Sequence, residues 1–387
     1  MPSRTWDEVW RKSEMVYVSN DVLVTGEPYT PGLSRTYVAQ RFGIDPAKIA
    51  KLGSAENPLG PSPKALVAVA GAFNELDLYP SWTAEKLREK IAAKYGFEPN
   101  QVVCGAGETE VIACVIRAFA KPGDKIVMYK PCFPIYHNFA ENEGRVPVYV
   151  DMGPGFEFRI DQYIETMKSS GARIAFLTNP HSPSGKMMRE ADIRRICEAA
   201  GDTLVVLDEA YIHFTETEGS LHLVREYDNL IVLRTFSKAF GLAGLRAGFG
   251  ISRPERIVPL LNIKPTWNMG CAQIAGAAAA LDDDDHVQRT VSLIVEMRGY
   301  VSQRMSALKA FRMVPDSRSN FFLIEITHPD LDSTKVFNEL LKFGVIVKDG
   351  SVSFKGLGKR YLRSDVSLKQ HMDRLVDALI EIERRAD

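Results

Sequence analysis

Residues 229–250 read NLIVLRTFSKAFGLAGLRAGFG, and this stretch decides the fold. A continuous apolar run, NLIVLRT (229–235), leads into a polar segment that contains a lysine. A glycine-rich turn then leads into a second run, RAGFGI (246–251). Apolar runs of this length, bounded by turn residues, are typical of β-strands that are buried on both faces. The stretch therefore predicts two strands inside a covered sheet, with polar side chains where the first strand ends.

Similar runs recur upstream, and helix-like stretches separate most of them. The runs are QVVCG (101–105), KIVMY (125–129), RIAFLT (173–178) and TLVVLD (203–208). The stretches 108–120 and 190–200 carry apolar residues at helical spacing. Alternation of strand and helix implies a mostly parallel sheet with helices on both faces. We therefore expect a three-layer α/β domain.

The C-terminal part of the chain has a different pattern. A helical pattern covers 287–311, and after it come FFLIEI (321–326), a helix near 334–343, the strand GVIVK (344–348) and a final helix at 367–386. This order predicts a smaller α+β domain. The N-terminal segment is irregular and rich in Pro and Gly, so we expect it to pack on the small domain. The predicted boundaries are 1–59 for this segment, 60–280 for the large domain and 281–387 for the small domain.

Length and composition exclude several classes of protein. The chain has 387 residues, of which 45 % are hydrophobic and 25 % charged, so it can bury a sizeable core and is not a disordered chain. Its net charge of −1 provides no basic surface for nucleic acid. No apolar stretch reaches the roughly 18 residues that would span a bilayer, and the N-terminus lacks the apolar region of a secretory signal. We expect a cytoplasmic protein without nucleic-acid or membrane partners.

Cysteines and acidic residues do not indicate a metal site. The five cysteines are scattered and form no CxxC pair, which argues against both a disulfide framework and a zinc site. The acidic run DDDD (282–285) is expected to cap or precede a helix. We therefore predict no metal.

The candidate chemistry starts at Lys238, close to Thr235 and Ser237 after a predicted strand. In a dry, polar pocket the amine would lose solvation, its pKa would fall, and it could attack a carbonyl carbon. Eight residues further on, Arg246 lies among glycines that let a guanidinium approach a compact anion. Together with the two hydroxyls, Arg246 can form a phosphate cup. The alternatives are a surface lysine in a loop and a glycine-rich turn with an exposed arginine.

A second candidate phosphate element is GAGET (105–109), which follows a predicted strand and opens a predicted helix. Backbone amides at a helix N-terminus bind phosphate through unpaired N–H groups and the helix dipole. If phosphate binds there, the carboxylate of Glu108 should point away from it. The alternative is that Glu108 only stabilises the helix dipole.

Polar side chains follow three predicted strands at regular intervals. Asn179 precedes Asp208 by 29 residues, and Asp208 precedes Lys238 by 30 residues, each the length of one strand–helix–strand unit. Tyr211 lies close behind Asp208. Ligands of open α/β sheets bind outside the carboxyl ends of the strands. An amide, a carboxylate and an amine there match pyridoxal 5′-phosphate, which has a phenolate, a ring nitrogen, a carbonyl and a phosphate. The alternatives are an acidic helix cap or Mg²⁺ ligand for Asp208 and a Pro-rich turn around Asn179.

Taken together, these motifs resemble the fold-type-I pyridoxal-phosphate aminotransferases, and among them most closely the histidinol-phosphate aminotransferase group. The motifs that carry the resemblance are PYTPG (28–32), KLGSAENPLGPSP (51–63), LYP (78–80), NPHSPSG (179–185), DEAY (208–211), RTFSKAFGLAGLRAGFG (234–250), SNFFLIEI (319–326) and LRSDVS (362–367). The resemblance implies a three-layer large domain that binds pyridoxal phosphate and a smaller α+β domain.

The resemblance also assigns roles around the cofactor. Lys238 would bind the cofactor aldehyde covalently, and Asp208 would keep the pyridine nitrogen protonated. Asn179 and Tyr211 would donate hydrogen bonds to the ring phenolate. Phe133 would stack on the ring, although packing in the core explains this residue equally well. The phosphate would be held by Thr235, Ser237, Arg246 and the amides of Gly107 and Glu108.

Three further roles concern the substrate and a second subunit. Arg363 would bind the substrate α-carboxylate with a bidentate pair, beside Asn179, and Tyr29 would close over the substrate. Tyr79 would reach the phosphate of the neighbouring subunit, which implies a homodimer with shared active sites.

The sequence departs from the usual pattern of this family at four places. Ala55 stands where the family has Asn, Glu108 where it has a small residue, and Lys348 where histidinol-phosphate enzymes have an arginine. After Arg363, residues 364–367 are Ser-Asp-Val-Ser, without the usual Thr and Gly. These departures leave the cofactor chemistry intact and bear on the choice of substrate.

The sequence thus predicts reversible amino transfer from an amino acid or an amino alcohol phosphate, histidinol phosphate or an aromatic donor among them, to a 2-oxo acid such as 2-oxoglutarate. An alternative on the same fold is a pyridoxal-dependent decarboxylase, another lyase or an oxidase. A regulator that only senses the cofactor would need a DNA-binding segment, for which the first 25 residues are too few. An NAD-dependent dehydrogenase would need a GxGxxG fingerprint, which the chain lacks.

Overall fold

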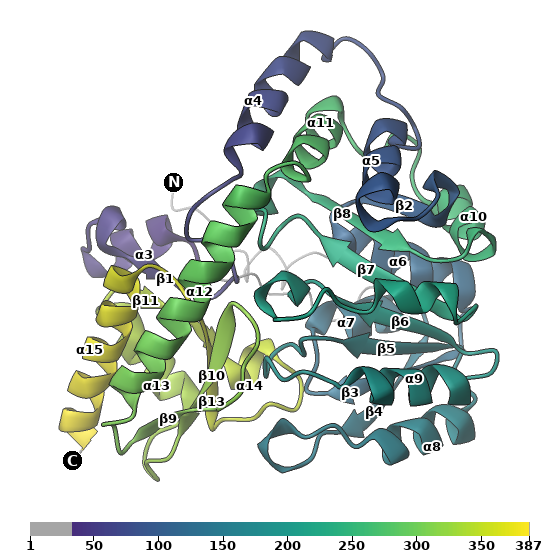
Figure 1. Cartoon of the computed structure of the whole chain (residues 1–387). Helices are drawn as coiled ribbons and strands as arrows, with labels where there is room; N and C mark the ends of the chain where they lie inside the picture. The colour runs from purple at the N-terminus through teal and green to yellow at the C-terminus, as the bar shows by residue number, and fades with distance from the viewer. Residues whose placement is uncertain (1–32, 387) are drawn as a thin grey trace, which may run out of the picture.

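The computed structural model describes residues 33–386, and its larger domain is built on a single sheet (Figure 1). Within the described residues this sheet has seven strands in the order β2-β8-β7-β6-β5-β3-β4. Neighbouring strands are parallel, except that β8 runs antiparallel to β2 and β7. The strands are β2 (Val102–Ala106), β3 (Lys125–Lys130), β4 (Val146–Asp151), β5 (Ile174–Thr178), β6 (Leu204–Asp208), β7 (Leu230–Thr235) and β8 (Ala247–Ile251). The predicted α/β fold with a mostly parallel sheet is confirmed.

Successive residues of a strand point to opposite faces of this sheet, and helices cover both faces. Leu204 and Val206 of β6 pack on the face covered by α6 (Glu108–Phe119), α7 (Pro134–Asn142) and α10 (Pro254–Ile263). Val205 and Leu207 pack on the face covered by α5 (Glu85–Tyr95), α8 (Ile160–Ser170), α9 (Glu190–Ala199) and α11 (Cys271–Ala280). A further helix, α4 (Pro63–Ala72), lies against α11. Because both faces are dry, β6 is apolar until Asp208 at its carboxyl end.

The smaller domain is an α+β unit beside the large sheet (Figure 1). Among the described residues its main sheet has four antiparallel strands in the order β12-β13-β10-β9. The elements are α12 (Asp284–Met305), β9 (Phe311–Met313), β10 (Phe321–Ile326), α13 (Ser333–Lys342), β12 (Lys348–Asp349), α14 (Gly350–Ser353), β13 (Tyr361–Asp365) and α15 (Lys369–Ala386). The helix predicted through residue 311 ends at Met305, because Phe311 begins β9 and is buried in the core. No helix within residues 33–386 is both long and apolar enough to cross a bilayer.

The described part of the N-terminal segment packs on this smaller domain. β1 (Ala50–Lys51) pairs in parallel with β11 (Val345–Ile346). Before it, α3 (Arg35–Phe42) contributes Val38 to a small apolar cluster with Leu341. The chain then returns to the large domain through the loop after β1. The domain boundaries at residues 59 and 280 stay a prediction.

A buried ion pair fixes the ends of β6 and β7 relative to each other. Arg234 Nη2 lies 2.7 Å from Glu209 Oε2, and the two side chains are 3 % and 0 % exposed. The other carboxylate oxygen, Oε1, accepts a hydrogen bond from Ser220 N over 2.6 Å. A buried charge without a partner would cost several kcal/mol, so the pair holds these strand ends together. The same two ends carry Asp208 and Lys238.

Candidate active site

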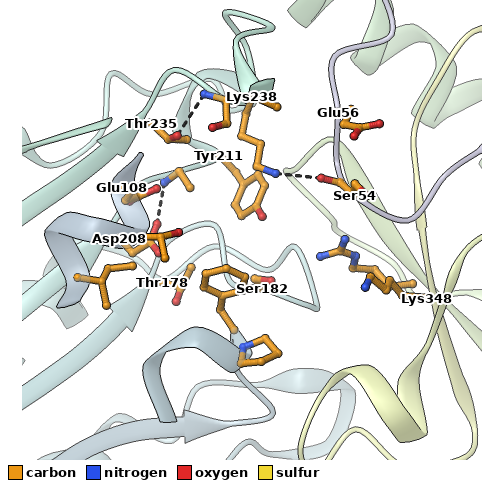
Figure 2. Close-up of a pocket in the computed structure, with 18 of the residues that line it drawn as sticks. Ser54, Glu56, Glu108, Thr178, Ser182, Asp208, Tyr211, Thr235, Lys238 and Lys348 are labelled. Atoms are coloured by element: carbon orange, nitrogen blue, oxygen red, sulfur yellow. Dashed lines mark hydrogen bonds between the residues drawn. The ribbon is translucent and has the colours of Figure 1, made fainter. Parts of the chain in front are cut away.

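A cavity of about 250 Å³ lies at the carboxyl ends of β5, β6 and β7 (Figure 2). One wall is formed by these strand ends and the start of α6. The other is formed by the small domain and the loop after β1. Open α/β sheets bind ligands in this position. Of the residues predicted from the sequence, the structure brings to the cavity wall Glu108, Phe133, Asp208, Tyr211, Thr235, Ser237, Lys238, Arg246 and Arg363.

Lys238 extends into the cavity from the loop after β7 (Figure 2). Its Nζ donates a hydrogen bond to the Ser54 carbonyl oxygen over 3.1 Å and lies 5.4 Å from the ring centroid of Tyr211. Burial, together with the nearby Arg363 guanidinium, lowers the pKa of Lys238 to about 8. A large share of the amine is therefore unprotonated at mildly alkaline pH, and the unprotonated amine is the form that attacks a carbonyl carbon.

Asp208 is the last residue of β6, and its carboxylate is held by two donors. Oδ1 accepts a hydrogen bond from Ala210 N over 2.9 Å, and Oδ2 accepts one from the Tyr136 hydroxyl. Burial raises the pKa of Asp208, and both donors oppose that rise because they stabilise the anion. The carboxylate is thus a fixed acceptor on the cavity wall, suited to a protonated ring nitrogen.

Tyr136 and Thr178 also belong to this site, although neither was predicted from the sequence. The Tyr136 hydroxyl lies 2.9 Å from Thr178 Oγ1, and its ring stacks on Phe176 with 4.6 Å between centroids. Tyr136 lies three residues after Phe133, which caps the start of α7, and the two rings meet edge to face with 5.6 Å between centroids. This short spacing was the available signal, because it places a hydroxyl beside a ring already assigned to the site.

The predicted phosphate-binding residues lie together at the start of α6. The first backbone N–H groups of a helix have no partner within that helix, so they can receive an anion. Gly107 has φ +79°, and a Cβ there would lie 2.3 Å from Arg246 Nη2. Only glycine therefore lets the guanidinium reach the helix start. Ser237 N donates a hydrogen bond to Thr235 Oγ1 over 3.1 Å, and this bond holds the two hydroxyl-bearing residues of the cup together. These donors fit the phosphate of pyridoxal phosphate.

Glu108 opens α6 beside this cup, and the expectation that its carboxylate points away from a bound phosphate stays a prediction. Its side chain lines the cavity, and Oε1 is buried without a hydrogen-bond partner. Burial, and then the neighbouring Asp208, raise the pKa of Glu108 well above its usual value. A carboxyl group that keeps its proton carries no charge that a phosphate would repel.

Asn179 differs from the prediction, because its amide does not line the cavity. Asn179 Oδ1 accepts from Met188 N over 2.8 Å, and Nδ2 donates to Met188 O over 3.2 Å, so both polar atoms are used to hold the backbone. Ser182 lines the cavity instead, and its buried hydroxyl has no partner. His181 holds this loop through Ser184 Oγ and Pro131 O. The path of the loop decides whether residue 179 or residue 182 reaches the cavity wall. The only signal of this path in the sequence was the two flanking prolines.

Arg363 lies on the small-domain wall and is tied to the loop after β1. Its Nη2 donates to Gly53 O over 3.2 Å and lies 3.7 Å from Asp365 Oδ1. Asp365 Oδ2 accepts from Ser54 N over 2.7 Å and from Ala55 N over 2.6 Å. Ala55 has φ +52°, a conformation that alanine rarely adopts, and these bonds hold it there. Asp365 therefore places both the arginine and the loop whose carbonyl receives Lys238.

Three remaining predicted residues have different outcomes. Tyr211 lines the cavity with its ring edge-on to Phe321, at 4.8 Å between centroids. Tyr79 is 80 % exposed, stacks on Trp267 at 4.5 Å, and is not on the wall of this chain's own cavity. Tyr29 lies outside the described residues. The roles given to all three stay predictions.

Comparisons with known proteins agree with the fold. A family model for aminotransferase class I and II matches residues 47–379. The histidinol-phosphate aminotransferase of Anaeromyxobacter sp. (strain Fw109-5) is 36 % identical over 356 residues, which cover 91 % of this chain and 95 % of that protein. The one from Methanocella arvoryzae is also 36 % identical, covering 92 % and 95 %. The structure of histidinol-phosphate aminotransferase from Sinorhizobium meliloti in complex with pyridoxal-5′-phosphate has a TM-score of 0.85 at 23 % identity, covering 97 % and 100 %. The resemblance inferred from the motifs is confirmed over most of the chain.

The lowered pKa of Lys238 leads to a direct prediction about its reactivity. In protein freed of cofactor, labelling of this amine by trinitrobenzenesulfonate should reach half its maximum at about pH 8, because the protonated amine below that pH does not react. Peptide mass spectrometry reads the labelling of Lys238 separately from that of the exposed lysines. Arg363→Met removes a neighbouring positive charge and should move the midpoint upward. A wild-type midpoint near that of an ordinary lysine, about 10.4, would contradict the proposed environment.

Proposed function

Because the chain belongs to the class I and II aminotransferases, we propose that its amino donor is histidinol phosphate or a closely similar amino alcohol phosphate, and that its acceptor is 2-oxoglutarate. An aromatic amino acid is the second candidate donor. The chain is a pyridoxal-phosphate-dependent aminotransferase, so the cofactor and the class of reaction are the premises of this proposal. The question that remains is which molecule fits the small-domain side of the cavity.

The observation that carries the choice of donor is a pair of buried cations on that side. Arg363 and Lys348 both line the cavity, and Figure 2 shows Lys348 across the cavity from Asp208. Burial and the Arg363 charge lower the pKa of Lys348 to about 8. Asp365 lies beside Arg363, with 3.7 Å between Arg363 Nη2 and Asp365 Oδ1. A donor with a phosphate group would form charge-assisted hydrogen bonds with the two cations.

Each of the other wall residues has a proposed task with respect to the cofactor. When bound, pyridoxal phosphate supplies an electron sink for the carbon that carries the donor's amine. Asp208 accepts a hydrogen bond from the ring nitrogen, and Phe133 packs against the ring. The hydroxyls of Ser182 and Tyr211 are the donors on the wall for the ring oxygen, in place of the amide of Asn179. The phosphate is held by the start of α6 with Thr235, Ser237 and Arg246.

Lys238 has two proposed tasks. Its Nζ is the nucleophile that binds the cofactor aldehyde, and after release it is the base that accepts the proton from the amine-bearing carbon of the donor. The Ser54 carbonyl oxygen is the acceptor that orients Nζ toward the centre of the cavity. The lowered pKa serves both tasks, because a base works best when its pKa is near the working pH.

A donor comparison with 2-oxoglutarate as acceptor tests this proposal. Histidinol phosphate should have the highest kcat/KM, and histidinol without its phosphate should be lower by at least about thirtyfold, the equivalent of about 2 kcal/mol for a lost buried ionic contact. Lys348→Met should reduce the activity with histidinol phosphate and leave that with histidinol nearly unchanged. Lys51→Met is the matched control, since Lys51 lies near the cavity but pairs with Glu56. If phenylalanine or tyrosine is the best donor, the phosphate proposal is wrong.

The same assay distinguishes transamination from decarboxylation. Enzyme incubated with the donor alone should stop after one turnover, because no oxo acid is present to restore the cofactor. A decarboxylase would continue and release CO₂.

We further propose that the chain acts as a homodimer in which Tyr79 completes the site of the other subunit. Tyr79 belongs to a segment with large exposed apolar side chains, and such patches mark interaction surfaces. The exposed members are Phe73, Leu76, Leu78, Tyr79 and Trp82, at 55 %, 67 %, 64 %, 80 % and 53 %. A second copy of this chain would cover these side chains and bring a hydroxyl to the neighbouring cavity.

Replacing one residue of this patch by a charge tests the dimer. Leu78→Asp should convert the dimer to a monomer in sedimentation velocity, because an unpaired carboxylate cannot be buried in the interface without a large cost. Ile380→Asp is the control, because Ile380 is 44 % exposed on α15 and distant from the patch in sequence. A wild-type chain that sediments as a monomer at micromolar concentration would contradict the proposal.

A further inference from the structure

Among residues 33–386, Glu108 is the one carboxyl group on the cofactor side of the cavity whose side chain has no task in the proposed function. It is the first residue of α6, it is 8 % exposed, and its Oε1 is buried without a partner. Figure 2 shows it on the same wall as Asp208. A buried polar atom without a hydrogen-bond partner raises the free energy of the folded protein, so it indicates a group that is available to bind a partner.

The charged and titratable groups that face Glu108 come from each element packed around it. Asp208 at the end of β6 is within hydrogen-bonding reach of its carboxyl group. Glu209, which follows Asp208, acts on it more weakly and is paired with Arg234. The other neighbours are Lys238 after β7, Tyr136 on α7, Tyr211 after β6 and Arg246 before β8. Asp208 is therefore the neighbour that decides its charge.

Two buried carboxyl groups within hydrogen-bonding reach of each other cannot both be ionised cheaply, so they share one proton. The hydrogen bonds decide which group keeps it. Asp208 receives donors on both oxygens, from Ala210 N and from the Tyr136 hydroxyl, and these favour its anion. Glu108 Oε1 receives none. The proton therefore resides on Glu108, in agreement with the raised pKa of this residue.

We propose that Glu108 is a positioning residue for the cofactor that acts as a neutral acid, donating its proton to Asp208 so that the pair presents one negative charge to the ring nitrogen and none to the phosphate. The cofactor carries a net negative charge, because its phosphate outweighs the pyridinium. A second carboxylate at the start of α6 would therefore repel it and would also cancel part of the helix dipole that attracts the phosphate. The inference rests on the proposed placement of the phosphate at α6.

A consequence of this role is a dependence of cofactor affinity on pH. Below the pKa of Glu108 the pair carries one charge, and the cofactor binds at full strength. Above this pKa, Glu108 has lost its proton and must take one up again when the cofactor binds. The dissociation constant should then rise by up to about tenfold per pH unit, as linkage requires for one proton.

The test measures binding of pyridoxamine 5′-phosphate, which forms no bond with Lys238, so that titration of the lysine does not dominate the result. Enzyme loaded with this ligand is studied by equilibrium dialysis from about pH 6 to about pH 10. The variant is Glu108→Gln, which keeps a donor and cannot ionise. Titration of the ligand itself is common to all variants, so the measured quantity is the ratio of wild-type to variant dissociation constants.

This ratio should be near one at the acid end and should rise toward about tenfold per pH unit once Glu108 ionises. Glu110→Gln is the matched control: Glu110 lies in the same helical turn, and its carboxylate bonds Ala106 N and Asn268 away from the cavity wall. Its ratio should stay constant with pH. If Glu108→Gln does not fold, Glu108→Met, which also carries no charge, should reproduce the rise.

Two results would overturn the inference. One is a ratio for Glu108→Gln that does not change with pH. The other is tighter binding by this variant already at the acid end, which would mean that Glu108 is charged in the native protein. A wild-type chain that binds no pyridoxamine phosphate at all would instead refute the proposed function, so the two failures can be told apart.

Discussion

The cost of holding charge away from water constrains the whole site, because the ionisable side chains that line the cavity include Glu108, Asp208, Lys238, Lys348 and Arg363. The two lysines respond with lowered pKa values, since each is buried near a guanidinium that cannot lose its proton. The two carboxyl groups respond by sharing a proton. What the cavity can bind follows from these responses: a carbonyl carbon at the lysine, a cationic ring nitrogen at Asp208, and anions at the two ends.

The constraint also explains how two domains make one site. Asp365 on β13 binds the amides of Ser54 and Ala55, and the Ser54 carbonyl oxygen receives Lys238 Nζ from the large domain. Asn320 donates to Ala55 O over 3.0 Å and completes this anchor. The position of the amine therefore depends on the small domain, although the lysine itself belongs to the large one. The same carboxylate lies beside Arg363 and so links the placement of the amine to that of the substrate.

The sequence was sufficient to predict the strands, because burial alone decides where they lie. Strands buried on both faces are continuous apolar runs, so β6 and β7 were predicted nearly to the residue, and Asp208 and Lys238 follow from their ends. The sequence was insufficient where the path of a loop or the protonation of a side chain decides which groups line the cavity. Ser182 replaces Asn179 on the wall because the loop folds back. Glu108 lines the cavity with its pKa raised by burial and by Asp208, a neighbour 100 residues away in the chain.

The proposed site depends on Lys238 being the amine to which the cofactor is joined. Borohydride reduction of the holoenzyme converts a lysine-bound cofactor into a stable secondary amine, and peptide mass spectrometry then identifies the lysine that carries it. We expect the added mass on the peptide that contains Lys238 and on no other. Added mass on Lys348 or on a surface lysine, or none at all in protein that retains its cofactor, would contradict it.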